Sequence, residues 1–275
     1  MMKTVFVTGA GSLVGLATAE ALTRAGHRVF ATMRDPFDRN RDAANVLWAQ
    51  GIDVVHMDVT EDASVDEATG YARRKSGRLD VLVNAARTSA TFSTLGEAPT
   101  EFGRILEVNV VGTFRVLRAV VPGMRGARSG LVINVGSIFG RVGMPQLGLS
   151  TVAEAATEAL TDVAQAEFAP FGVDVVLVRH GMHPDMTNRH HATAPDVSRP
   201  DGTSHSRLTP PGMLDAPDTA EIAATICSLV AQHSGYRASR MTVGNPYGTD
   251  MLDRHVEDLR RDVLDMAGQA ERPPG

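Results

Sequence analysis

The chain has 275 residues, with 27 lysines and arginines against 32 aspartates and glutamates and a formal net charge of −5. This balance offers no basic face for nucleic acid, and no apolar run is long enough to span a bilayer. The single cysteine, Cys227, cannot form an internal disulfide, and its apolar surroundings predict a core position. The sequence starts with a strand and a loop rather than a signal peptide, so we expect a cytoplasmic protein.

The first predicted unit is a strand at Thr4–Val7, followed by a glycine-rich turn and a helix at Leu16–Ala25. This order is typical of a dinucleotide site, in which a pyrophosphate lies at the helix N-terminus. It also occurs as a plain strand–helix turn with no ligand, so both interpretations stay open. The candidate cofactor residues of the turn are Gly9, Gly11, Ser12, Leu13, Val14 and Gly15.

Short apolar strands alternate with helices along most of the chain. This alternation predicts one Rossmann-like α/β domain over residues 1–270, with a doubly wound, mostly parallel sheet of about seven strands and helices on both faces. Residues 185–216 read as a polar, proline-rich lid loop, and residues 271–275 as a frayed tail. Further strands are expected at 27–32, 53–57, 79–83, 131–135, 173–178 and 240–243, and helices at 101–124, 218–232 and 250–266.

The last predicted helix carries its apolar side chains on one stripe, which we expect to pack on the body or on a partner subunit. The stripe consists of Leu252, Val256, Leu259, Val263 and Met266.

The stretch from Leu131 to Glu154 reads as a buried strand, then Ser137, then a glycine-rich loop and an alanine-rich helix. It resembles the catalytic segment of the short-chain dehydrogenase/reductase family, where a serine is followed about a dozen residues later by Tyr-x-x-x-Lys. Aligned without a gap, Ser137 matches the family serine. The tyrosine position is then Ser150 and the lysine position is Glu154.

The resemblance implies a chain that lacks the family's proton donor and the cation that tunes it. In the family, the tyrosine hydroxyl exchanges a proton while the nicotinamide exchanges a hydride, and the lysine lowers the hydroxyl pKa. Glu154 places a negative charge where a positive one is needed. We therefore expect that ordinary catalysis is lost or replaced.

The resemblance also assigns a cofactor role to residues after the first four strands. Arg34 and Ser12 favour NADP(H) over NAD(H), although Arg34 is equally well explained as a solvated surface charge. Leu13 replaces a family glycine and Arg87 adds bulk beside the nicotinamide channel, or grips a phosphate or carboxylate, so cofactor binding itself is in question. The remaining matched residues are Asp58, Val59, Asn84, Ala85, Ala86 and Gly181.

Further candidates for the reaction centre are Asn109, which matches a family asparagine, and the histidines that follow the sixth strand. Asn109 is also explained as a polar residue satisfied within a buried helix. His180 and His183 are replacement proton donors or plain loop residues. The spacing of the loop histidines does not form a tight ligand pattern, so we predict no metal site.

We expect a non-catalytic subunit or partner of an active reductase in a biosynthetic pathway. It would form a homo-oligomer, or a hetero-oligomer with an active paralogue, through the helix at 101–124 and the one that starts near Ser150. The alternative is an enzyme of small-molecule, secondary-metabolite biosynthesis: an atypical NADPH-dependent ketoreductase, or a redox-neutral cyclase, dehydratase or isomerase. A silent subunit should show a blocked cofactor cleft and apolar helix faces, whereas an altered enzyme should keep an open cleft lined by polar groups.

Overall fold

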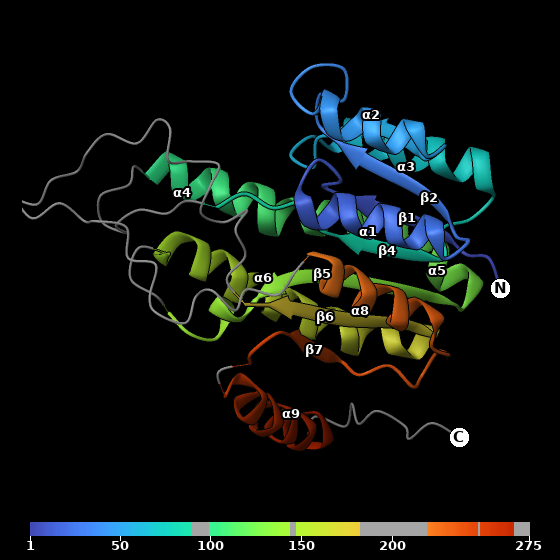
Figure 1. Ribbon diagram of the computed structural model, residues 1–275. Coiled ribbons are helices and arrows are strands. Elements are labelled where there is room, and N and C mark those ends of the chain that lie inside the picture. The colour runs from blue at the N-terminus through green and yellow to red at the C-terminus, as the bar shows by residue number, and fades with distance from the viewer. Residues whose placement is uncertain (90–98, 144–146, 182–218, 247, 267–275) are drawn as a thin grey trace, which may run out of the picture.

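The computed structural model describes residues 1–89, 99–143, 147–181, 219–246 and 248–266 (Figure 1). Seven parallel strands form one sheet in the order β3-β2-β1-β4-β5-β6-β7. The chain builds outward from β1 to β3, crosses back to β4, and then builds outward again to β7, which confirms the predicted doubly wound fold. The strands are β1 (Thr4–Thr8), β2 (Arg28–Met33), β3 (Asp53–His56), β4 (Val81–Asn84), β5 (Gly130–Ser137), β6 (Val173–His180) and β7 (Arg240–Val243).

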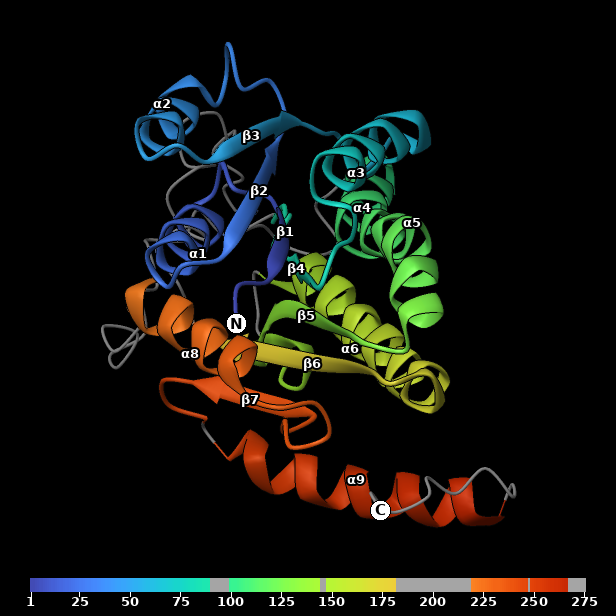
Figure 2. The same ribbon diagram turned by 90° about the vertical axis from the view of Figure 1, so that its right-hand side faces the viewer.

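Helices cover both faces of the sheet (Figure 2). One face carries α1 (Leu13–Arg24), α2 (Arg41–Ala49) and α8 (Thr219–Ala231). The other carries α3 (Asp62–Ser76), α4 (Pro99–Leu106), α5 (Gly112–Ala127) and α6 (Gly148–Phe168).

Each face of the sheet has its own apolar core. Successive β1 side chains point to opposite faces, as the pleat requires, so Val5 packs with Leu22 of α1, and Phe6 packs in the second core with Val120 of α5. All four of these side chains are closed to solvent or nearly so. The near-continuous apolar strands follow from this burial on both faces.

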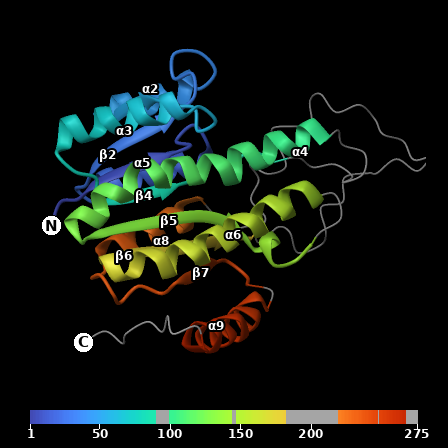
Figure 3. The same cartoon turned by 180° about the vertical axis from the view of Figure 1, so that it is seen from behind.

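The helix predicted at 101–124 is a longer rod with an irregular centre (Figure 3). Between α4 and α5 the chain makes a π turn at Glu107–Val111, and this turn contains Asn109. A π turn adds one residue to a helical turn, but the apolar residues before and after it keep their helical spacing. The sequence pattern therefore did not reveal the π turn. Such π turns are frequent at functional sites.

The structure shows that one expectation about the C-terminal half is wrong. For a second expectation, which had two alternatives, it argues against one of them. His180, expected in a loop, is the last residue of β6, because the pairing with β5 continues to Ser137. The apolar stripe of α9 (Thr249–Met266), expected on the body or on a partner, is not covered by the body: Leu252, Leu259 and Val263 are exposed. The lid at 185–216 and the tail at 271–275 lie outside the described residues.

None of the helices in the described ranges is both long and apolar enough to cross a membrane.

The start of α5 lies against the segment that follows β3, and glycine makes this approach feasible. A Cβ on Gly112 would lie 2.7 Å from Cγ2 and 3.0 Å from Cβ of Val59. Gly123, on the same helix, has nothing within 4 Å of such an atom. Position 112 is therefore a packing constraint, and position 123 is an open helical site.

We predict opposite effects of alanine at these two glycines. Gly112→Ala should lower the free energy of unfolding by about 1–3 kcal/mol because it overpacks the contact with Val59. Gly123→Ala should raise it by up to about 1 kcal/mol through helix propensity. Urea unfolding of both variants measures the difference, and equal effects would contradict the packing assignment.

Candidate functional site

The carboxyl ends of the central strands bring the predicted site residues to one edge of the sheet. Gly9 follows β1, Asn84 ends β4, Ser137 ends β5, and His180 ends β6 with Gly181 after it. Gly9, Ser137 and Gly181 therefore all lie at carboxyl ends of strands. Ligands of doubly wound sheets bind at this edge, where the strand order reverses between β1 and β4.

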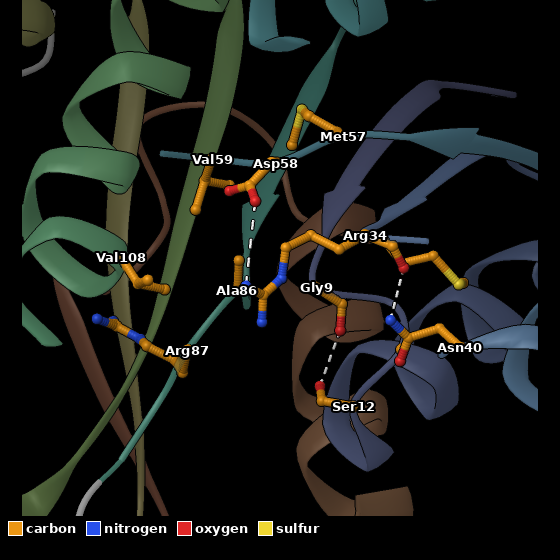
Figure 4. A pocket seen from close by; sticks show the side chains of 12 residues that line it. Gly9, Ser12, Arg34, Asn40, Met57, Asp58, Val59, Ala86, Arg87 and Val108 are labelled. Atoms are coloured by element: carbon orange, nitrogen blue, oxygen red, sulfur yellow. Dashed lines mark hydrogen bonds and ion pairs between the residues drawn. The ribbon is translucent and has the colours of Figure 1, made fainter. Parts of the chain in front are cut away.

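A cleft of about 100 Å³ opens at the ends of β1 to β4 (Figure 4). Seven of the predicted cofactor residues line it. Its walls also include residues that the sequence did not single out, of which Met33 and Met57 lie at or just past strand ends. The full lining is Gly9, Gly11, Ser12, Met33, Arg34, Asn40, Met57, Asp58, Val59, Ala86, Arg87 and Val108.

Arg34 and Asp58 face each other across this cleft (Figure 4). Their closest charged atoms, Nη1 and Oδ2, are 4.0 Å apart, and the Arg34 side chain is 41% exposed. Asp58 is held by Thr60, whose backbone N–H and hydroxyl both donate to Oδ1, at 2.9 and 2.7 Å. Asn40 donates to the Arg34 carbonyl at 2.6 Å. The backbone of Arg34 is therefore held in place, whereas its guanidinium group is partly open to solvent. This arrangement suits a guanidinium that exchanges Asp58 for a phosphate group.

In the turn after β1, backbone segments lie too close together for side chains at the two glycines. Gly9 has a φ of +69°, and a Cβ on Gly15 would lie 2.3 Å from the Gly9 carbonyl oxygen. The Ser12 hydroxyl caps α1 by accepting from the Gly15 N–H at 3.1 Å, and it donates to the Gly9 carbonyl at 2.9 Å. Leu13 is 45% exposed and is not among the residues that line the cleft. Its predicted effect on a bound pyrophosphate stays a prediction.

Five of the other predicted cofactor residues are buried outside the cleft lining. Val14, Gly15, Ala85 and Gly181 are buried and do not line the cleft. Asn84 donates through Nδ2 to Oδ1 of Asn134 at 2.9 Å, a pair inside the sheet.

The side chain of Glu154 on α6 is hydrogen-bonded to the carboxyl end of β5. Its Oε2 accepts from the backbone N–H of Ser137 at 3.0 Å, and the residue is 6% exposed. Ser150, one helical turn earlier on α6, is also buried. The Ser137 hydroxyl accepts a long 3.4 Å bond from the Phe139 N–H, at the short helix Ile138–Gly140. The predicted residues Ser137, Ser150 and Glu154 are thus brought to one buried region.

Arg87 is bound inside the protein, although it also lines the cleft. Its Nε donates to the Val135 carbonyl at 2.9 Å, and its Nη1 donates to Thr157 Oγ1 at 3.0 Å and to the Asn109 carbonyl at 3.2 Å. Its Nε lies 4.0 Å from Oε1 of Glu154. The guanidinium therefore supplies a cation beside the Glu154 carboxylate.

Thr157 was missed by the sequence interpretation. It lies one turn after Glu154 on α6, so helical spacing was the signal that could have placed it on the same face.

Asn109 clamps the loop after β4. Its Oδ1 accepts from the Thr88 N–H and its Nδ2 donates to the Thr88 carbonyl, both at 2.8 Å. These two bonds favour the second interpretation of this residue, a polar side chain satisfied inside a buried helix.

His180 lies beside Ser137, because the two residues are direct partners in the β5–β6 pairing. Its Nδ1 lies 2.6 Å from the Gly181 carbonyl oxygen. His183 and the later loop histidines lie outside the described residues. Within the described part of the chain, no three His, Cys, Asp or Glu side chains converge as a metal site.

Comparison with known proteins gives consistent matches. The family model described as short chain dehydrogenase matches residues 3–194. An oxidoreductase of Botryotinia fuckeliana is 32% identical over 181 residues, 66% of each chain. The 3-ketodihydrosphingosine reductase of Bacteroides thetaiotaomicron is 32% identical over 180 residues, 64% of this chain and 62% of its own. The matched region thus spans just under two thirds of these two relatives.

Solved structures agree over longer ranges. A short-chain dehydrogenase from Streptomyces avermitilis superposes with a TM-score of 0.73 and 25% identity, covering 98% of this chain and 97% of that one. An alcohol dehydrogenase from the archaeon Thermococcus sibiricus, complexed with 5-hydroxy-NADP, gives 0.69 and 25%, covering 89% and 97%.

We predict that Arg87 and Glu154 stabilise the fold as a pair. Arg87→Met or Glu154→Gln alone should lower the free energy of unfolding by about 2–4 kcal/mol, because each leaves a buried partner uncompensated. The double variant should lose less than the sum, with a coupling of about 1–3 kcal/mol. A double-mutant cycle in urea measures it.

The exposed pair Glu101–Arg104 provides the control for that cycle, with side chains 31% and 43% exposed. The matched cycle Glu101→Gln with Arg104→Met should couple by less than about 1 kcal/mol. Additive losses at Arg87 and Glu154 would mean that the two groups act independently.

Proposed function

Because this chain belongs to the short-chain dehydrogenase family, we propose that it is an NADP(H)-binding member that does not run the family's ordinary hydride and proton transfer. It acts as a non-catalytic subunit or partner of an active reductase in small-molecule biosynthesis. The bound nucleotide then stabilises the subunit rather than serving as a reductant.

The cleft residues fit the nucleotide part of NADP(H). The glycine turn and the N-terminus of α1 suit the pyrophosphate, Arg34 suits the 2′-phosphate, and Asp58 suits the adenine. The cleft is small, so binding requires Arg34 to leave Asp58. The NADP-type ligand of the Thermococcus sibiricus enzyme supports this choice of cofactor. NADPH would supply a hydride in the family's ordinary reaction, whereas in this proposal the residues named here only bind and orient the nucleotide.

One observation carries the non-catalytic assignment. The Glu154 carboxylate, at the family lysine position, is buried against the Ser137 N–H and the Arg87 guanidinium. A carboxylate held there disfavours a developing alkoxide, and the neighbouring Ser150 hydroxyl is a much weaker acid than a tyrosine. The described residues at these two positions thus supply neither the donor nor the free cation that the family reaction uses.

Exposed apolar side chains on α5 and α6 support a subunit role. Phe114 on α5 and Val152 and Val163 on α6 are between 45% and 54% exposed. These two helices are the ones expected to form the oligomer contact. The face fits a second copy of the chain or an active paralogue.

The second candidate is an enzyme with altered chemistry, and the placement of His180 beside Ser137 favours it. An imidazole at this edge is a potential proton donor for an atypical NADPH-dependent ketoreductase, or for a redox-neutral cyclase, dehydratase or isomerase. The relative named 3-ketodihydrosphingosine reductase agrees with the first of these.

Cofactor choice can be tested at Arg34. We expect the parent to bind NADPH more tightly than NADH, and Arg34→Ala to weaken NADPH binding by about 10- to 100-fold, since one charged hydrogen-bonding partner is lost. Arg39→Ala, an exposed arginine outside the cleft lining, is the matched control and should change nothing. Fluorescence titration gives the affinities. Equal affinities that the Arg34 substitution leaves unchanged would refute the assignment.

Catalysis can be tested by restoring the family residues. The unmodified protein should not oxidise NADPH with simple ketones at a rate typical of the family. Ser150→Tyr with Glu154→Lys and Arg87→Gly should raise the rate by at least about 10²-fold, because a tuned acid is restored. The same two changes on α6 with Arg87 retained should stay inactive, since the introduced lysine would then face the buried guanidinium.

Steady NADPH oxidation by the unmodified protein would contradict the subunit proposal. In that case His180→Ala tests the second candidate, which requires the rate to fall.

A further inference from the structure

Helix α9 turns three of its charged side chains, Asp253, Glu257 and Arg260, toward the body of the protein. Asp253 pairs with the fully buried Arg179, and Glu257 pairs with Arg240 at 3.1 Å. Arg260 donates to two acceptors on α6, each at 2.8 Å. These contacts fix the rotation of α9 about its own axis, because they lie on one side of the helix.

The contact between α9 and the body is polar and loosely packed. A cavity of about 390 Å³ lies between α9 and β7, and it is lined mostly by charged side chains, including Arg179, Arg240 and Glu257. The helix runs along the outer edge of the molecule, beyond the last strand (Figure 2). The described part of the chain therefore covers little of the apolar surface of α9.

The apolar side chains of α9 are consequently at the surface. Leu252, Leu259, Val263 and Met266 are between 49% and 80% exposed, and Met251 beside them is also exposed. The helix has six acidic and three basic residues, which disfavours docking on an anionic membrane. An apolar stripe of this kind on an acidic helix marks a protein contact.

The spacing of the stripe specifies the kind of partner. Leu252, Val256, Leu259, Val263 and Met266 are separated by four, three, four and three residues, the repeat of a left-handed coiled-coil seam. We propose that this seam packs against α9 of a second copy of the chain, with the two helices antiparallel. The pair places Leu252 against Val263 of the second copy and Val256 against Leu259 of the second copy, each contact occurring twice by symmetry.

Charge complementarity selects this alignment. In it, His255 on each copy lies beside Asp262 of the other, so two favourable polar pairs flank the apolar seam. Shifting one helix by a heptad would place Asp262 against Asp262 and Arg260 against Arg260. Both contacts are repulsive, so the shifted alignment is disfavoured.

The first experiment measures the mass of the full chain in solution by light scattering. Leu259→Asp places a charge in the centre of the seam and should halve the measured mass. It should leave the far-ultraviolet circular dichroism unchanged, because the side chain is 64% exposed in the single chain. Tyr236→Asp, at an 85% exposed residue outside α9, is the control and should leave the mass unchanged. An unchanged mass with Leu259→Asp would overturn the proposal.

The second experiment tests the antiparallel alignment by charge exchange. His255→Asp should weaken association by roughly 10-fold, because two aspartate pairs then face each other. The double variant, His255→Asp with Asp262→Lys, should have a dissociation constant within about 2-fold of that of the parent. In a parallel pair, the introduced aspartate would instead face Arg260, so tighter association of His255→Asp would overturn the alignment. Failure of the double variant to recover would overturn it as well.

Discussion

Three carboxylates on one face of α6 enter the interior of the protein, and each is matched by an arginine from another part of the chain. They are spaced four residues apart, so one helix face presents them all. Burial raises the pKa of Glu158 and of Asp162, and the facing arginines oppose that rise. Burying a charge without its partner costs several kcal/mol, so the pairs must form together. They are Glu154–Arg87, Glu158–Arg179 and Asp162–Arg240.

The first of these ion pairs links two residues that the sequence interpretation treated separately, Glu154 and Arg87. In the proposed match to the family pattern, Glu154 stands at the lysine position and Arg87 at a glycine position, far apart in the sequence. In the fold, the guanidinium lies 4.0 Å from the carboxylate, and both contact the end of β5. A glutamate alone would be an uncompensated buried charge, and an arginine alone would add an unpaired cation beside the strand. The two side chains together leave this part of the interior without an unpaired charge.

The sequence predicted the fold and seven of the residues that line the cleft, because both depend on local signals. Apolar strands and the glycine turn fix where parallel strands end, and this places Gly9, Ser137 and Gly181 on one edge. The role of Arg87 was not predictable, because its partners come from β5, α6 and the π turn. That turn was hidden too, since the apolar period on either side of Asn109 fits a regular helix. What the sequence could not provide was long-range pairing of charges.

The orientation of α9 follows from the same pairing. An amphipathic helix normally covers the core with its apolar side. Here Arg179 is closed to solvent near the end of β6 and has one carboxylate from α6 on one side. Asp253 of α9 meets it from the other side. Satisfying that cation turns the charged face of α9 inward, and the geometry of a helix then leaves the apolar stripe outside. The buried ion pairs along α6 thus also determine which side of α9 faces away from the protein.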